Sequence, residues 1–281
     1  MPTVDESALA ELRKEIFLAG RHAGMAHLAS AYSCLEILYA LYAKGVMRYR
    51  PEDPEWEGRD LFVMSKGHGS LALYAVLGSI GVLPSDWRMD FARPGTDLGG
   101  EPSLCRRLGL EASTGSLGHG LSLAAGMALS LKRQRSKRKV FVLMGDGECE
   151  EGSVWEAAIT APKYDLHNLV AIIDCNGIQK MGALGDVVGR GGWCEQFASL
   201  GWNCLDVDGH DVGALVDAFS RIQGNDRPTA MFAKTVKGKG VSLMEGNPAW
   251  HWRLPSKKET KVFVAELGVT EEELESCKKH I

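Results

Sequence analysis

The sequence predicts an α/β fold, a doubly wound parallel sheet with helices on both faces. Short, continuous apolar runs at 140–144, 169–173 and 230–233 are typical of strands that are buried on both sides. Segments with helical spacing alternate with these runs along the chain, which is the order expected of a parallel α/β sheet. The 33 glycines indicate many tight turns and close backbone approaches.

The strands and helices follow from the spacing of the apolar residues. A further strand is expected at 202–207. Leu9, Leu12 and Ile16 recur at helical spacing and predict a first helix over about 7–22. Further helices are expected at 33–43, 70–80, 121–131 and 212–222, and one more through Trp155 and Ala158.

Two segments are expected to be irregular. Residues 47–59 are rich in proline and charge, and residues 179–192 carry many glycines. The second segment follows a predicted strand, and long loops after the strands of an α/β sheet are common ligand sites.

The chain is expected to form one domain over residues 1–281, with a short tail from about 255. Its 281 residues fit a single large α/β domain. No further α/β domain is expected after Leu254. The tail is expected to hold one charged helix over about 270–279, capped by Thr270.

Composition excludes several classes of function. The net charge of −4 does not favour bulk nucleic-acid binding, and the basic run 132–139 is expected to be a solvated connection at a helix C-terminus. The longest apolar stretch, 71–83, is too short to span a bilayer. The seven scattered cysteines lack a C-x-x-C pair, which favours a reducing, cytoplasmic location.

The strongest chemical signal lies where two apolar runs end. Asp146 and Gly147 follow the run 140–144, and Asn176 follows the run 169–173. If the two strands are parallel neighbours, a carboxylate and an amide oxygen meet at one edge of the sheet, where they suit Mg²⁺. The alternative is a strand-to-helix turn with a capping aspartate. The two flanking strands and the spacing favour the metal site.

The wider sequence resembles the N-terminal segment of transketolases, which bind thiamine diphosphate. The resemblance covers nearly the whole chain, in the order of the family's motifs. The matching segments are AHLASAYSCLEILYALY, SKGHGS, EASTGSLGHGLSLAAGMAL, GDGECEEGSVWEAA, DCNGIQ, DVDGHD and KTVKGKGVS.

The resemblance implies a metal and diphosphate site. Asp146, Asn176 and the main-chain carbonyl of Ile178 would hold Mg²⁺, or Ca²⁺ or Mn²⁺ in its place. Gly147 would lie close to the cofactor diphosphate, and His68 would contact it.

The resemblance also implies residues on the ring and substrate sides of the cofactor. Gly115, Ser116 and Leu117 match the turn beside the aminopyrimidine ring. His27 and His251 match histidines that face the substrate, and His251 also contacts the diphosphate. A lone histidine is more often a buried structural residue, but three in matched motifs favour a catalytic and binding set. The remaining candidates, His22, His167 and His210, are expected to be structural.

Several positions leave alternatives open. Glu101 stands where the family often has a histidine that holds the donor's terminal hydroxyl, and Trp252 replaces a common glycine, so the substrate is not fixed. Glu151 and Glu156 match acids between the two cofactor sites of a dimer, or simply complement a helix dipole. The lysines Lys234, Lys237 and Lys239 either meet phosphates or are exposed loop charges.

The function implied is that of the N-terminal subunit of a heteromeric transketolase. It would transfer a two-carbon ketol unit from a ketose to an aldose, on sugar phosphates. A C-terminal partner subunit would bring the pyrimidine-binding domain and the activating glutamate, in an α2β2 assembly. The alternatives are a transketolase-like subunit of a specialised sugar or secondary-metabolite pathway, and a cofactor-binding subunit without catalysis.

Overall fold

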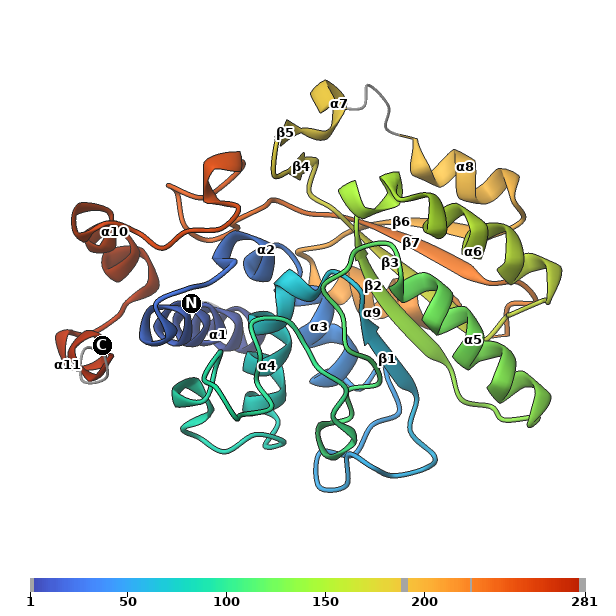
Figure 1. The fold of residues 1–281 in the computed structure, drawn as a ribbon, viewed down its shortest axis with the longest axis horizontal. Helices are drawn as coiled ribbons and strands as arrows, with labels where there is room; N and C mark the ends of the chain where they lie inside the picture. Colours follow the sequence, from blue (N-terminus) through green and yellow to red (C-terminus); the bar gives the residue numbers. More distant parts are fainter. Residues whose placement is uncertain (1–2, 188–191, 223, 278–281) are drawn as a thin grey trace.

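The computed structural model describes residues 3–187, 192–222 and 224–277. It contains a five-stranded, all-parallel sheet with the strand order β1-β2-β3-β7-β6. Helices cover both faces of the sheet, so the predicted doubly wound α/β class is confirmed (Figure 1). The strands are β1 (Leu61–Met64), β2 (Val140–Gly145), β3 (Leu169–Cys175), β6 (Asn203–Asp208) and β7 (Thr229–Lys234).

Alternate side chains of each central strand enter two separate apolar cores. In β2, Phe141 and Leu143 join the core on one face, whereas Val142 and Met144 join the core on the other. Both sets are almost fully buried. The strands therefore read as continuous apolar runs, because neither face meets water.

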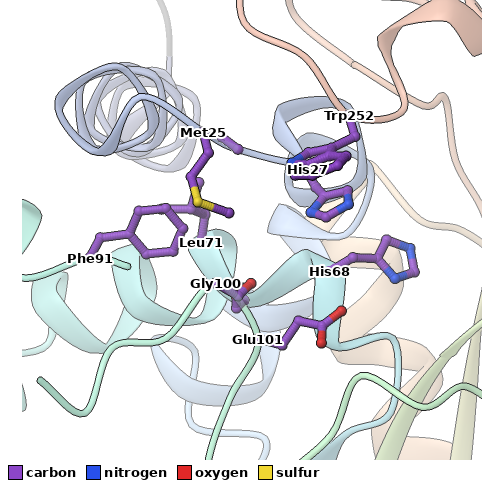
Figure 2. Close-up of a pocket in the computed structure, with 10 residues that line it drawn as sticks. Met25, His27, His68, Leu71, Phe91, Gly100, Glu101 and Trp252 are labelled. Carbon is purple, nitrogen blue, oxygen red and sulfur yellow. Dashed lines mark hydrogen bonds between the residues drawn. The ribbon is translucent and has the colours of Figure 1, made fainter. Parts of the chain in front are cut away.

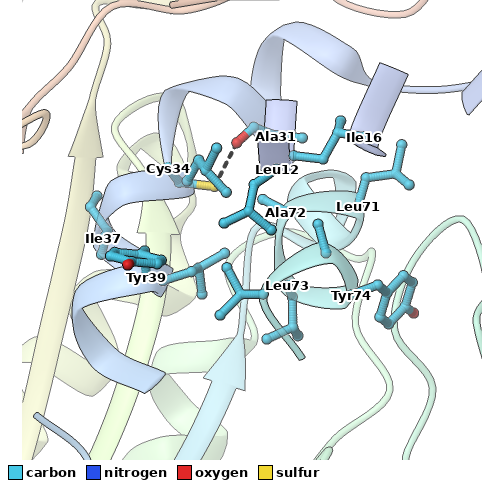
Figure 3. Close-up of a cluster of buried hydrophobic side chains, with 14 of the residues drawn as sticks. Leu12, Ile16, Ala31, Cys34, Ile37, Tyr39, Leu71, Ala72, Leu73 and Tyr74 are labelled. Atoms are coloured by element: carbon cyan, nitrogen blue, oxygen red, sulfur yellow. Dashed lines mark hydrogen bonds between the residues drawn. The ribbon is translucent and has the colours of Figure 1, made fainter. Parts of the chain in front are cut away.

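The larger core lies under the helices on the first face. Leu12 and Ile16 of α1 pack near Leu73 of α4, and all three are buried (Figure 3). The helices with residues in this core are α1 (Val4–Ala23), α2 (Leu28–Ser33), α3 (Leu35–Tyr42), α4 (Ser70–Ser79), α9 (Val212–Arg221) and α10 (Lys257–Leu267).

The second face is covered by α5 (Gly120–Arg133), α6 (Gly152–Lys163) and α8 (Trp193–Ser199). Small residues on α5 and α6, such as Ala124 and Ala158, are fully buried in its core. They allow the two helices to approach each other and the sheet closely.

The tail is more ordered than the sequence predicted. The expected helix from 270 corresponds to α11 (Glu271–Ser276), with Thr270 as its cap, and the last expected residues, 278 and 279, lie outside the described residues. The helix α10 was missed. It begins at a capping box formed by Ser256 and Glu259, and its buried Phe263 stacks near Phe17 of α1. The apolar side of α10 is narrow, so the spacing of its apolar residues was only a weak indication of a helix.

Six other helices and strands were not predicted, among them α2, which precedes the helix expected at 33–43. β1 has only four residues, and α8 follows directly on the segment expected to be a loop. Within that segment the chain forms the hairpin β4 (Ile178–Gln179) and β5 (Gly182–Ala183), then α7 (Leu184–Val187), while residues 188–191 lie outside the described residues. Short 3₁₀ turns occupy Gly67–Gly69, Trp87–Met89, Arg106–Leu108, Gly147–Glu150 and Pro248–Trp250.

None of the helices within the described ranges is long and apolar enough to cross a membrane.

Candidate functional site

Asp146 ties together the carboxyl ends of β2 and β3. Its Oδ1 accepts a hydrogen bond from the Gly147 amide at 2.8 Å, and its Oδ2 accepts one from the Gly177 amide at 2.6 Å. Burial, and after it the nearby carboxylate of Asp174, raise the pKa of Asp146 to about 6. A carboxylate in such surroundings is stabilised by a cation, so the position suits a metal ligand.

Asn176 presents its amide in a fixed orientation at the same edge. Its Nδ2 donates to Asp174 at 3.2 Å, which leaves Oδ1 on the opposite side, where it accepts from the Ile178 amide at 3.1 Å. Asp146, Asn176 and the Ile178 carbonyl thus bring oxygen donors to one edge of the sheet, and oxygen donors of this kind fit Mg²⁺, Ca²⁺ or Mn²⁺.

A buried ion pair lies beneath these oxygen donors. Lys66, which precedes the Gly67–Gly69 turn, contacts Asp174 of β3, and both side chains are almost wholly excluded from solvent. Asp174 also accepts hydrogen bonds from Ser33 and Thr235. Burial alone would raise the pKa of Asp174, but Lys66 and these hydrogen bonds lower it. The sequence patterns did not single out this network.

Three predicted histidines meet in space although they are far apart in sequence. His27 lies just before α2, His68 in the turn after β1, and His251 after the turn that follows β7. The ring centroids are 5.6 Å apart for His27 and His68, 5.5 Å for His27 and His251, and 5.7 Å for His68 and His251.

The histidine cluster is neutral near pH 7. Burial, followed by the charges of Lys237 and Lys66, lowers the pKa of His27 to about 4. Burial, Lys237 and His27 lower the pKa of His251 to about 4, and burial, with Lys66 next, places the pKa of His68 well below its ordinary value. A neutral imidazole donates a hydrogen bond through one ring nitrogen and accepts one through the other, which suits contacts with substrate hydroxyls.

Lys237 connects His251 to Ile178, at the edge of the sheet where Asp146 and Asn176 lie. Its Nζ donates to the Ile178 carbonyl at 2.9 Å and lies 3.3 Å from Nδ1 of His251. The residue is only 2 % exposed, whereas Lys234 is exposed. Lys237 is therefore not an exposed loop charge, which was one of the two alternatives left open by the sequence, and a phosphate contact stays a prediction.

The turn Gly115–Leu117 lies against the Gly67–Gly69 turn. A side chain at Gly67 would come within 3.0 Å of the Gly115 amide nitrogen, and Gly115 itself has a φ of 129°, which L side chains rarely adopt. The buried Glu148 holds this region in place, because it accepts from the Gly118 amide at 2.9 Å and also contacts Ser65. Glu148 directly follows the Asp146-Gly147 pair but was not predicted as a site residue.

A pocket of about 380 Å³ opens beside the histidine cluster. Trp252 stacks on His27 with the ring centroids 5.7 Å apart and the planes at 15°. Figure 2 shows the Glu101 carboxylate pointing to the side of the pocket where His68 lies. The lining residues are Met25, Ala26, His27, His68, Ser70, Leu71, Phe91, Gly100, Glu101 and Trp252. The pocket is thus largely apolar, with a carboxylate at one side.

Glu151 and Glu156 lie apart from this cluster. Glu151 stands at the start of α6, where its side chain makes no capping hydrogen bond, and it packs beside Gly118. Glu156 lines a separate cavity of about 280 Å³ between α5 and α6. Ser116, Thr114 and His119 line a further cavity at the start of α5.

Residues 17–277 match the family model described as "Transketolase, thiamine diphosphate binding domain". An apulose-4-phosphate transketolase subunit from Actinobacillus succinogenes is 37% identical over 264 residues, which cover 94% of this chain and 95% of that protein. The 6-deoxy-6-sulfo-D-fructose transketolase subunit SqwG of a Clostridium species is 36% identical, with 87% of this chain and 89% of that protein covered.

Solved structures show the same likeness. Transketolase from Campylobacter jejuni superposes with a TM-score of 0.84 at 27% identity, covering 95% of this chain. Transketolase from Pichia stipitis in complex with sedoheptulose-7-phosphate gives a TM-score of 0.85 at 27% identity, covering 99% of this chain. The chain spans only 43% and 44%, respectively, of the length of these two proteins.

Proposed function

This chain belongs to the transketolase family, and on that premise we propose that it is the N-terminal, diphosphate-binding subunit of a two-chain transketolase. Its reaction would transfer a two-carbon ketol unit from a ketose phosphate to an aldose phosphate, with thiamine diphosphate and Mg²⁺ as cofactors. The observation that carries the proposal is the convergence of the His27, His68 and His251 cluster with Lys237 and the Asp146 edge of the sheet.

The residues present fit the cofactor diphosphate and its metal. Asp146, Asn176 and the Ile178 carbonyl supply the oxygen donors for the metal, and Gly147, which has no side chain, lets the backbone approach a phosphate. Lys237 adds a buried positive charge that offsets the charge of a diphosphate.

The histidines and the turn Gly115–Leu117 would have separate roles around the cofactor and the substrate. Bound thiamine diphosphate supplies the carbon nucleophile and the electron sink for cleavage of a C–C bond. His27 and His251, neutral near pH 7, would exchange protons with substrate hydroxyls, and His68 would contact the diphosphate. The turn of Gly115, Ser116 and Leu117 would lie beside the aminopyrimidine ring.

A second, partner chain is part of the proposal. Relatives that match this chain over most of both lengths are named as subunits of transketolases. The exposed apolar side chains Leu123, Ile159 and Tyr164 on and just after α5 and α6 mark the face that the partner would cover, with Glu151 and Glu156 at the junction of two sites. We place the activating glutamate in the partner, in an α2β2 assembly. The cysteines are free thiols, which fits a cytoplasmic location.

The test is to purify the native complex through this chain, determine the subunit masses and bound thiamine diphosphate, and assay ketol transfer. Asp146→Ala should lower kcat/KM at least 100-fold, because changes to groups that merely support metal ligands already cost about 10- to 100-fold. Asp217→Ala, at an exposed position on α9, serves as the control. Full activity of the Asp146→Ala complex would overturn the proposal.

A second candidate, ketol transfer in a specialised sugar pathway, is favoured by the pocket. Glu101 and Trp252 give it a carboxylate and a bulky indole, and relatives of the chain are named for unusual ketose derivatives. A screen of the assembled pair on xylulose and fructose phosphates separates the two candidates. Robust turnover of these ordinary donors would make the specialised function unnecessary.

A further inference from the structure

The segment 235–240, which follows β7, carries Lys237 into the site. It is held along its length by separate contacts: Thr235 donates to Asp174, the Gly238 amide donates to the Ala29 carbonyl at 3.0 Å, and the Gly246 amide donates to the Lys237 carbonyl at 3.0 Å. The segment is therefore a fixed arm rather than a free loop.

Three side chains from distant parts of the chain also fix the position of segment 235–240. Glu36 of α3 is buried and contacts Arg13 of α1, and its other carboxylate oxygen lies 3.1 Å from Nδ1 of His210, in the turn after β6. Arg13 Nε donates to the Lys239 carbonyl at 2.9 Å, and the Val236 amide donates to Nε2 of His210 at 2.8 Å. Arg13 and His210 thus form hydrogen bonds with the backbone on both sides of Lys237.

The hydrogen-bond directions fix the tautomer of His210. The Val236 amide can only donate, so Nε2 of His210 accepts and the ring proton sits on Nδ1, facing Glu36. Glu36 is the shared acceptor, since Arg13 and His210 both donate to it. Arg13, Glu36 and His210 work as one unit, because removing the Glu36 carboxylate disturbs both of these backbone hydrogen bonds at once.

We propose that Arg13, Glu36 and His210 are a positioning unit for Lys237. They hold segment 235–240 at the place where Nζ reaches the Ile178 carbonyl and His251. This inference rests on the proposed function, in which Lys237 meets the cofactor diphosphate. It predicts that the unit contributes to the binding of the diphosphate and contributes nothing to the binding of the thiamine rings.

The nearly isosteric variant Glu36→Gln tests the unit. A carboxamide offers one acceptor oxygen and one NH₂ donor, so it cannot accept from Arg13 and His210 together. One of the two side chains then loses its fixed position and its hydrogen bond to the backbone of segment 235–240. Titration calorimetry on the complex with Mg²⁺ should show thiamine diphosphate affinity weakened about tenfold, the size of effect seen when a supporting contact at a metal site is removed. Affinity for thiamine, which has no phosphate, should stay unchanged.

A double-mutant cycle with Lys237→Met decides between positioning and a general structural role. If the unit acts through Lys237, adding Glu36→Gln to Lys237→Met weakens thiamine diphosphate affinity no further. If the two losses multiply, or if thiamine affinity falls equally, the inference is wrong. Glu11→Gln, at an exposed glutamate of α1, is the matched control and should leave both affinities unchanged.

A second variant keeps the test decisive if Glu36→Gln fails to fold. His210→Asn alters a side chain at the margin of the core, 14% exposed, and removes the ring that accepts from Val236. It should reproduce the selective loss of diphosphate affinity, and no loss would overturn the inference. Failure of the proposed function gives a different result, since the unaltered complex would then bind no thiamine diphosphate at all.

Discussion

Two regions of the site differ in how completely the chain itself determines them. The anchoring region is made of Lys66, Asp146, Asp174, Asn176 and Lys237. Its four charged groups are buried and held by contacts inside the chain, and Asn176 is half-buried. The pocket in Figure 2 combines buried side chains, such as Leu71 and Phe91, with two exposed ones: Trp252 is 60% exposed and Met25 is 39% exposed.

The difference between the two regions indicates which positions of this molecule tolerate substitution. Changes in the anchoring region disturb buried charge and therefore stability, because the remaining partner is left unpaired in a dry environment. Changes in the open pocket leave the fold intact and alter which molecules enter. We expect variation in the pocket to change specificity, and variation in the anchoring region to cost the fold.

The largest expected effect is that of Lys66→Met, which leaves the Asp174 carboxylate buried without its cation. The free energy of unfolding, measured by urea denaturation, should fall by about 3–5 kcal/mol. Lys66→Met combined with Asp174→Asn removes both charges and should be more stable than the single variant. A double variant less stable than the single one would refute the view that unpaired charge is the cause.

The next effect is a pH dependence of the cofactor-free chain. Because the pKa of Asp146 is raised from 3.8 to about 6, the folded state binds this proton more tightly than the unfolded state. The stabilisation is complete below pH 3.8 and is lost as the pH rises towards 6, at most about 3 kcal/mol. Urea denaturation across this range in EDTA should show the fall, and Asp146→Asn should lack it. Equal slopes in both proteins would contradict the prediction.

The smallest effect on stability is expected in the pocket. Trp252→Ala should change the free energy of unfolding by less than about 0.5 kcal/mol, since the side chain is largely exposed. It should widen the entrance and raise kcat/KM for longer ketose phosphates relative to shorter ones by roughly tenfold. Val4→Ala, at an exposed position at the start of α1, is the control. An unchanged substrate ratio would show that Trp252 does not limit entry.

The sequence predicted well what depends on chain order and local pattern. The central strands, and the position of Asp146 beside the end of β3, where its Oδ2 accepts from the Gly177 amide, follow from two apolar runs that end in polar residues, because parallel neighbours finish at the same edge. The three histidines lay in motifs, and the structure brings them together. Their roles toward cofactor and substrate stay predictions.

The sequence alone did not predict side-chain contacts between residues that are far apart in the chain. Lys66 and Asp174 lie 108 residues apart, and neither carries a local signal that names the other. Glu36 reads as an ordinary polar position in an apolar helix, although it is buried against residues from two other elements. Among the lysines of KTVKGKG, only the tertiary fold determines that Lys237 turns inward, since all sit in the same glycine-rich pattern.

The packing of α10 on α1 has a consequence for the order of events during synthesis. The last strand of the sheet, β7, ends at Lys234, but His251 belongs to a later stretch that Phe263 fastens to Phe17. Synthesis proceeds from the N-terminus, so all strands of the sheet have been made before His251 is added. The histidine cluster therefore cannot be complete until the chain has extended well beyond the last strand of the sheet.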